Sequence, residues 1–183
     1  PDMQRAFQST QRLVMEVDLN DPLMTDQFQE TMMLSKGKAF SDFFESVEEC
    51  DRFARVLAEK KQIDLEMYKA FKPFVLISAL AMKSLTCPTA SSYEMNLSKM
   101  SMERDMQVSG LESAAFQLSI FDKMDAAFIR SLLWESVADD ATNAAMEKQM
   151  VALYKEQDLT GLYELVKNSG EFKGHEKEFL SDR

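Results

Sequence analysis

Two short segments of the chain have the pattern of buried strands, whereas helical patterns occupy most of the rest. Residues 12–18 are mainly apolar and β-branched, and an Asn-Asp-Pro turn follows them. Residues 107–111 alternate apolar and polar positions. A long helical crossover separates the two segments, and parallel pairing requires such a connection. We therefore predict that 12–18 and 107–111 are adjacent parallel strands of one sheet.

The pattern predicts a mostly helical α/β fold with a partial parallel sheet. A large helical insertion spans about 23–104, and a helical remainder spans 114–183. The length of 183 residues suits a single domain over 1–183. Because two strands alone would be marginally stable, we expect strands of a longer chain to complete the sheet. The chain begins at Pro1 instead of Met, from which we expect an upstream segment.

Several helix boundaries follow from residues that favour helix ends. We expect Ser41 to begin a short helix, and the spacing of Ser46 and Glu49 is that of a capping box, in which each side chain binds a backbone N–H of the other residue. Asp64 is expected to begin a further helix that continues to position 71. Proline disrupts a helix interior, so Pro73 should divide that helix from the next one.

An apolar run over 74–82 is the longest in the chain. A membrane-spanning helix needs about 20 apolar residues, so we interpret this run as a buried core helix and expect no membrane span. The formal net charge of −10 argues against a nucleic-acid partner, because phosphate binding relies on clustered Lys and Arg. The same charge argues against binding to an anionic membrane surface.

The residue types that most often carry catalysis are sparse. His175 is the single histidine and lies in a polar context, and HExxH, GxSxG, P-loop and GxGxxG motifs are missing from the sequence. Cys50 and Cys87 are isolated, which argues against a zinc ribbon. A disulfide between them requires Cα atoms about 4.4–6.8 Å apart, and two free, buried thiols are favoured.

Fourteen methionines raise the question of a copper site, because thioethers bind cuprous ions. At helical spacing, methionine more often fills gaps in a core, and we favour that interpretation, with some of these residues at ordinary surface positions. It applies to Met95, Met100, Met102 and Met106.

The two strands carry the most interesting acidic residues. Glu16 lies within an apolar strand and Glu112 directly follows the other one. A carboxylate in apolar surroundings is costly unless it is paired, hydrogen-bonded or bound to a metal. At the carboxyl ends of parallel strands, such groups face the crevice where α/β sheets place their sites. The structural alternative is that Glu16 pairs with an arginine or caps a neighbouring helix.

Five segments, in order along the chain, resemble the motifs of one protein family. The motifs are "LVxEVDL" at 13–19, "KPW" at 72–74 with Phe74 in place of Trp, "GxDxxL" at 92–97 with Ser92 in place of Gly and Glu94 in place of Asp, "VxGLExxxxQ" at 108–117, and the beginning of "LxxRNxxW" at 180–183. These motifs belong to the TraB/GumN family, which includes the Tiki-type proteases. The resemblance spans essentially the whole chain.

The resemblance implies an α/β fold that is related to erythromycin-esterase-like and haem-uptake proteins. It also implies metal-dependent hydrolysis of a peptide or protein substrate in the longer protein. Members of that kind carry two GxxH motifs, one before the position of Pro1 and one after that of Arg183. Because neither motif is in these 183 residues, we expect the chain alone to hold no divalent metal and to be inactive.

The resemblance also assigns roles to three residues. Glu16 would hold or orient the metal or its bound water, and Arg183 would stabilise developing negative charge. Glu112 would be a carboxylate beside the metal ligands or on the substrate side. Since bacterial relatives are often exported or lipid-anchored, we expect a periplasmic or cell-surface lipoprotein. One alternative function is a non-catalytic binding module whose helical insertion holds a peptide, haem or a partner helix. A purely structural scaffold is the other alternative.

Overall fold

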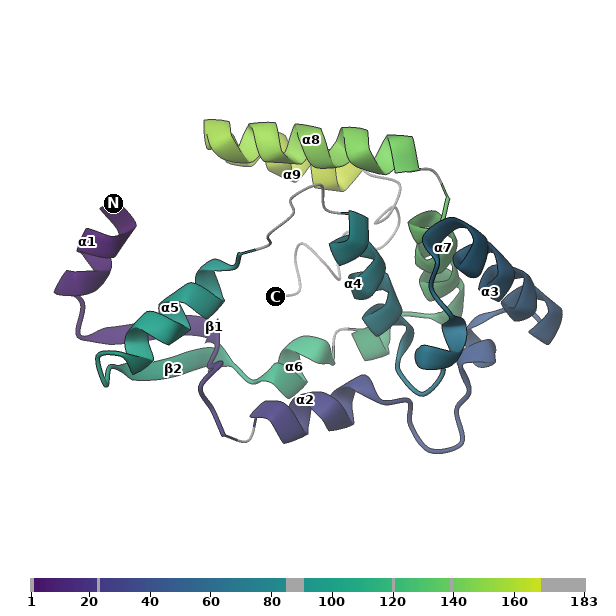
Figure 1. The fold of residues 1–183 in the computed structure, drawn as a ribbon, viewed down its shortest axis with the longest axis horizontal. Coiled ribbons are helices and arrows are strands. Elements are labelled where there is room, and N and C mark those ends of the chain that lie inside the picture. The colour runs from purple at the N-terminus through teal and green to yellow at the C-terminus, as the bar shows by residue number, and fades with distance from the viewer. Residues whose placement is uncertain (1, 23, 85–90, 120, 139, 169–183) are drawn as a thin grey trace. The chain divides into compact units, whose positions relative to one another are not determined.

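The computed structural model describes residues 2–22, 24–84, 91–119, 121–138 and 140–168. These residues fold as two compact units (Figure 1). The sheet unit combines Pro1–Met32 with Cys87–Asp122, and the helical unit combines Met33–Thr86 with Lys123–Arg183. The mostly helical α/β fold predicted from the sequence is confirmed. The single domain over 1–183 stays a prediction.

The sheet unit contains the predicted parallel pair. Strand β1, Arg12–Val17, pairs with strand β2, Gln107–Glu112. The register is continuous, because Arg12 pairs with Gln107 and every later pair that forms keeps the same offset. The prediction of adjacent parallel strands is therefore confirmed. The other elements of this unit are α1 (Asp2–Ser9), α2 (Met24–Met32), α5 (Tyr93–Met102) and α6 (Ala114–Leu118), and η3 (Phe121–Lys123) leads out of it.

A single arginine ties α1 to the segment that precedes β2. The Arg104 guanidinium donates hydrogen bonds to the backbone oxygens of Phe7 at 2.8 Å, Gln8 at 3.3 Å and Thr10 at 3.2 Å. It also lies over the Phe7 ring, 5.4 Å from its centroid. The last carbonyls of a helix lack partners within the helix and favour a positive charge nearby. Arg104 therefore anchors the end of α1 where the chain enters β1.

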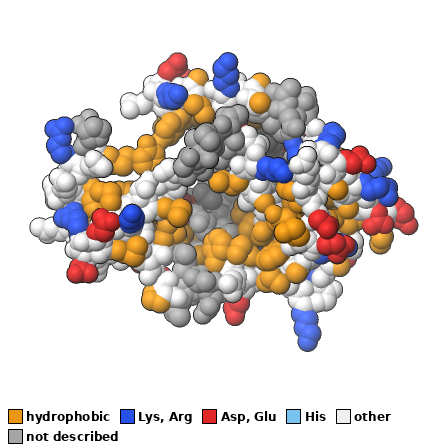
Figure 2. Space-filling model, viewed as in Figure 1, with side chains coloured by type: hydrophobic (Ala, Val, Ile, Leu, Met, Phe, Trp, Pro, Cys, Tyr) orange, Lys and Arg blue, Asp and Glu red, His pale blue; other side chains and the backbone are white. Residues whose placement is uncertain are grey.

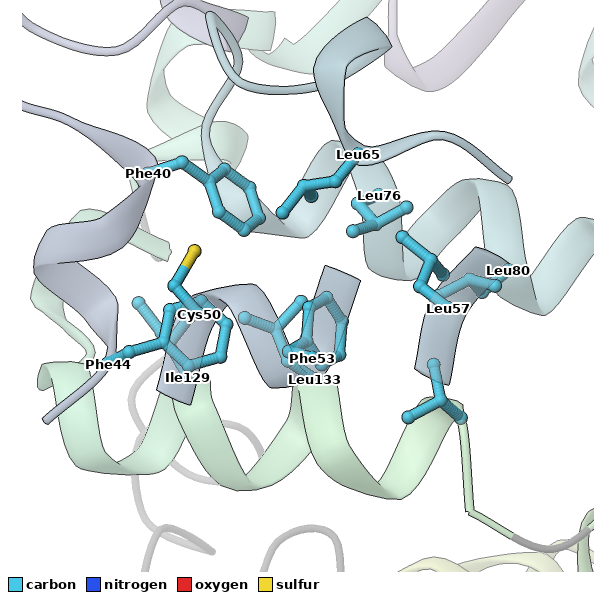
Figure 3. Packing of buried hydrophobic residues seen from close by; sticks show 11 residues of the cluster. Phe40, Phe44, Cys50, Phe53, Leu57, Leu65, Leu76, Leu80, Ile129 and Leu133 are labelled. Carbon is cyan, nitrogen blue, oxygen red and sulfur yellow. The ribbon is translucent and has the colours of Figure 1, made fainter. Parts of the chain in front are cut away.

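The helical unit is built around one apolar core (Figure 3). Its elements are η1 (Phe40–Phe43), α3 (Val47–Lys61), η2 (Leu65–Met67), α4 (Pro73–Ser84), α7 (Ala126–Ser136), α8 (Asp140–Glu156) and α9 (Leu159–Asn168). The core consists of Phe40, Phe44, Cys50, Phe53, Leu57, Leu65, Leu76, Leu80, Ile129, Leu133 and Val137. The apolar run over 74–82 thus belongs to a core helix, as predicted. No helix among the described residues is long and apolar enough to cross a membrane.

Aromatic contacts join α3 to its neighbours. The Phe53 ring lies 5.3 Å from the Phe44 ring and 5.3 Å from the Trp134 ring, the latter edge-on at 88°. The Trp134 indole N–H donates to a carboxylate oxygen of Glu49 at 3.0 Å. The Arg52 guanidinium lies 5.1 Å from the centroid of the same indole ring. These contacts fix α7 against α3 by packing and by a charge-assisted hydrogen bond.

Two of the helix boundaries differ from the prediction. The short helix was expected to have Ser41 as its N-cap. Its N-cap is Ala39, two residues earlier, and its first residue, Phe40, is buried in the core. The helix after Asp64 contains only three residues, Leu65–Met67, and the chain then forms an isolated bridge between Phe71 and Met33. The helix was predicted to continue to position 71, but Phe71 pairs with Met33 instead.

The capping box at the beginning of α3 is half formed. The Ser46 hydroxyl accepts a hydrogen bond from the Glu49 N–H at 3.2 Å, as expected. The Glu49 carboxylate accepts from the N–H of Glu45 at 2.8 Å, one residue before the position that a capping box requires. This hydrogen bond is the main reason why the pKa of Glu49 lies below its ordinary value.

Two methionines of α5 lie at the surface, whereas Met100 is half-buried. Met95 is 69% exposed and Met102 is 60% exposed. Two serines of the same helix, Ser98 and Ser101, are buried instead. The buried face of α5 is therefore polar, and hydrogen bonding to the turn after β1 decides which face turns inward.

Candidate functional site

The two acidic residues singled out in the sequence lie at the same end of the sheet but on opposite faces. Because the strands are parallel, their carboxyl ends share one edge, where Val17 pairs with Glu112. Residues paired in this way share a face and successive residues alternate, so Glu16 faces the other side from Glu112. Glu16 is exposed and Glu112 is half-buried. They do not converge in one crevice.

Glu16 does not carry the burial cost that an apolar strand would impose. Along β1, exposed positions alternate with half-buried and buried ones, and Glu16 falls on the exposed set. The buried position is Met15, which is 7% exposed. The structure gives Glu16 an interaction of its own, so it is not an isolated charge.

A network of polar side chains holds the turn after β1. The Asn20 N–H donates to Asp18 Oδ1 at 2.9 Å. Ser98 Oγ donates to Asn20 Oδ1 at 2.5 Å, and Asn20 Nδ2 donates to Ser101 Oγ at 3.3 Å. Ser101 Oγ donates in turn to the Ser98 carbonyl at 2.6 Å. Since Ser98 and Ser101 are buried, breaking this network would leave buried polar groups without partners.

Gly110 of β2 lies close against the chain that leaves β1. A Cβ atom at this position would lie 2.8 Å from the Asp18 backbone nitrogen and 2.9 Å from the Glu112 carbonyl oxygen. Both atoms belong to the backbone and have little freedom to move. The glycine therefore allows the chain that leaves β1 to pass directly over β2, and it positions the carboxyl end of the sheet.

One face of the sheet is open to solvent. It carries Arg12, Val14 and Glu16 of β1, and the register adds Ser109 and Leu111 of β2. Val14 is 50% exposed and Leu111 is 77% exposed. Arg12 Nη2 donates to Ser109 Oγ across the strands at 3.2 Å. We call these five residues the open face. Hydrophobic side chains are visible among charged ones on the surface (Figure 2).

The other candidate groups do not add to this site within the described residues. No three His, Cys, Asp or Glu side chains of the part that the structure describes group closely enough to hold a metal ion. This donor set does not fit a metal centre by itself. Cys50 is a free thiol in the core of the helical unit, where burial raises its pKa and keeps it protonated. Arg183, His175 and Cys87 lie outside the described residues.

Comparison with known proteins identifies the family. The chain matches the sequence model of the TraB/PrgY/gumN family over residues 1–183. The chain belongs to this family. The family resemblance inferred from the five motifs is therefore confirmed. No curated protein and no solved structure matches the chain.

Sequence reasoning missed the network that holds the turn after β1. Its signal was weak but present, because Asn20 ends a strand and two serines recur at helical spacing in a methionine-rich helix. Two serines at positions i and i+3 place their hydroxyls on one helix face, where both can form hydrogen bonds with a neighbouring loop. The pattern became interpretable only once α5 was seen to lie on the sheet.

Proposed function

We propose that the chain is part of a peptide hydrolase in which Glu16 is the carboxylate that touches the reacting groups. Two observations support this. The chain belongs to the TraB/PrgY/gumN family, and Glu16 faces solvent near the carboxyl end of a parallel strand pair. The second observation carries the proposal, because α/β sheets place their ligands outside the carboxyl ends of their strands.

The chemistry that suits an exposed carboxylate is general base catalysis. Glu16 accepts a proton from the attacking water while the water oxygen bonds to the peptide carbonyl carbon. It returns this proton to the leaving nitrogen as the C–N bond breaks. Arg183 stabilises the negative charge on the carbonyl oxygen, the role that the family resemblance gives it. A divalent metal bound by segments of a longer protein would activate the water further, with Glu16 as one oxygen ligand.

Glu112 serves a different purpose in this proposal. It is half-buried, lies on the face opposite Glu16 and pairs with Val17 at the last position of the sheet. A substrate that contacts the open face does not reach it. We therefore propose that Glu112 is a positioning residue, which holds the end of β2.

Hydrolysis of fluorescein-labelled casein by the natural full-length protein tests the proposal. Glu16→Gln should lower the initial rate by about 100-fold or more, as expected for loss of a general base. Glu59→Gln is the matched control, because Glu59 is an exposed glutamate on α3 in the helical unit. It should leave the rate unchanged. Equal thermal unfolding midpoints of the two variants would confirm that folding is intact.

Two results would contradict the proposal. One is a Glu16→Gln rate within about twofold of the wild type, since a general base contributes far more than that. The other is absence of hydrolysis by the wild-type full-length protein.

A binding module is the second candidate function, and the surface that favours it lies on α8 and α9, in the helical remainder and not in the helical insertion of about 23–104. Leu159 is 79% exposed, Tyr154 is 60% exposed and Tyr163 is 46% exposed, although α8 and α9 pack together. Exposed apolar side chains of this kind mark surfaces for a peptide, haem or a partner helix. Titration with haem, followed by its absorbance, tests one of these ligands. Saturable binding that Tyr163→Ser weakens, without peptide hydrolysis, would favour the module.

We also propose a periplasmic or cell-surface location with a lipid anchor, on the family resemblance. Cell fractionation and metabolic labelling with a fatty-acid analogue test it. Recovery of the unlabelled protein in the cytoplasmic fraction would contradict it.

A further inference from the structure

We infer that Val14 and Leu111 bind an apolar side chain of the peptide substrate, next to the bond that is cleaved, and that Arg12 binds a carboxylate of the same peptide. This inference rests on the proposed role of Glu16. It adds the class of peptide that the open face would select, namely extended peptides with a bulky apolar residue and a carboxylate a few residues away.

Val14 and Leu111 are the apolar side chains of the open face that lie next to Glu16. Val14 lies two residues before Glu16 on the same strand and face, a separation of about 7 Å. Leu111 is the residue that the register places opposite Glu16, at about 4.8 Å between neighbouring strands. A peptide bond that reaches the Glu16 carboxylate therefore has its neighbouring side chain over Val14 and Leu111.

The exposure of these side chains is the second step. Both faces of a parallel sheet are normally covered, and strand residues on both sides are then buried. In the sheet unit, Met15 is 7% exposed on the covered face, whereas Leu111 is 77% exposed on the open face. Covering Leu111 and Val14 with an apolar side chain of a substrate would remove apolar area from water, which favours binding.

The fixed charge at the other end of the open face is the third step. Arg12 is four residues before Glu16, about 13 Å along the strand at about 3.3 Å per residue. Its guanidinium is held by Ser109 Oγ at 3.2 Å and keeps further N–H donors for a ligand. Guanidinium groups bind carboxylates by charge-assisted hydrogen bonds. The partner is an acidic side chain or the free carboxyl terminus of the peptide.

The experiment measures fluorescence anisotropy of labelled peptides with the natural full-length protein. The reference probe has a central Leu, a Glu four residues away and an amidated carboxyl terminus. A second probe replaces Leu by Ser, and a third replaces Glu by Gln. A fourth keeps Gln but has a free carboxyl terminus at that position. The last two probes distinguish an acidic side chain from a terminal carboxylate.

Variants of exposed residues provide matched comparisons. Leu111→Ser should raise the Kd of the reference probe about tenfold and leave that of the Ser probe unchanged. Met67→Ser removes a similarly exposed apolar side chain from η2 of the helical unit and should change neither Kd. Arg12→Gln should weaken the probes with a carboxylate about tenfold and leave the amidated Gln probe unchanged.

Each outcome decides for or against the inference. Equal Kd values for Leu111→Ser and wild type would overturn it. An unfolding midpoint lowered by Leu111→Ser but not by Met67→Ser would also overturn it, since another segment or a second copy then covers the open face. Probe binding with these losses but without cleavage would support the inference and contradict the hydrolase. Cleavage of casein with no probe binding would support the hydrolase and contradict the inference.

Discussion

Replacement of Gly110 by alanine tests how the carboxyl end of the sheet is held. The added Cβ would lie 2.8 Å from the Asp18 nitrogen and 2.9 Å from the Glu112 oxygen, so each atom must move by about 0.5 Å to reach an ordinary contact. The Asp18 nitrogen belongs to the residue that directly follows β1 and the Glu112 oxygen to the last residue of β2, so movement of either atom strains the end of the strand pair. Overpacking of this kind costs about 1–3 kcal/mol.

Urea unfolding and hydrogen exchange measure this cost and its location. Gly110→Ala should lower the unfolding midpoint with an unchanged m-value and speed exchange of amides in β1 and β2. Gly37→Ala is the matched control, because Gly37 has φ +87° and open space around it. Its cost of about 1–2 kcal/mol comes from backbone conformation and should leave exchange in the sheet unchanged. Unchanged midpoint and unchanged exchange in Gly110→Ala would refute the close approach of the strands.

Three other expectations follow from the structure. Phe53→Ala should cost about 3–5 kcal/mol in urea unfolding, because Phe53 is fully buried between two aromatic rings; Val47→Ala, at an exposed site, should cost far less. The hydrogen bond from the Glu45 N–H is the main reason why the pKa of Glu49 is lowered in the folded protein. The ionised Glu49 carboxylate therefore stabilises the fold fully above the ordinary pKa of about 4.5, and this stabilisation is lost as the pH falls through the lower pKa of the folded state. The stability difference between wild type and Glu49→Gln should thus shrink between pH 6 and pH 3. The 183-residue chain alone should retain no stoichiometric zinc, manganese or cobalt after dialysis and should not cleave casein, and elemental analysis with near-stoichiometric metal would contradict this.

The strand pair was predictable because its signals are local. The apolar, β-branched composition of β1 and the long crossover to β2 require no knowledge of the rest of the fold. The relative orientation of Glu16 and Glu112 was not predictable in the same way. It depends on the register, and a shift of one residue moves every side chain of a strand to the other face.

The predicted helix boundaries were wrong where contacts with distant residues compete with the local preference of the sequence. Asp64 does begin a helix, as its side chain suggests, but burial of Leu65 and the bridge from Phe71 to Met33 end it after one turn. The prediction of which side chains of α5 face inward was incomplete for a related reason. Methionine is the more apolar residue, yet the serines turn inward because Asn20 supplies their hydrogen-bond partner. The end of the helix after Asp64 and the buried face of α5 both depend on residues that lie elsewhere in the sequence.

The discontinuous sheet unit has a consequence for synthesis on the ribosome. Arg12 pairs with Gln107, so β1 is made about 95 residues before its partner. At about 5–20 residues per second, this strand stays unpaired for roughly 5–20 s. Unpaired apolar strands associate with other chains, and charged residues within them oppose this. Arg12 and Glu16, whatever they do in the folded protein, thus also protect the nascent chain from aggregation, and neutralising both should lower the soluble yield.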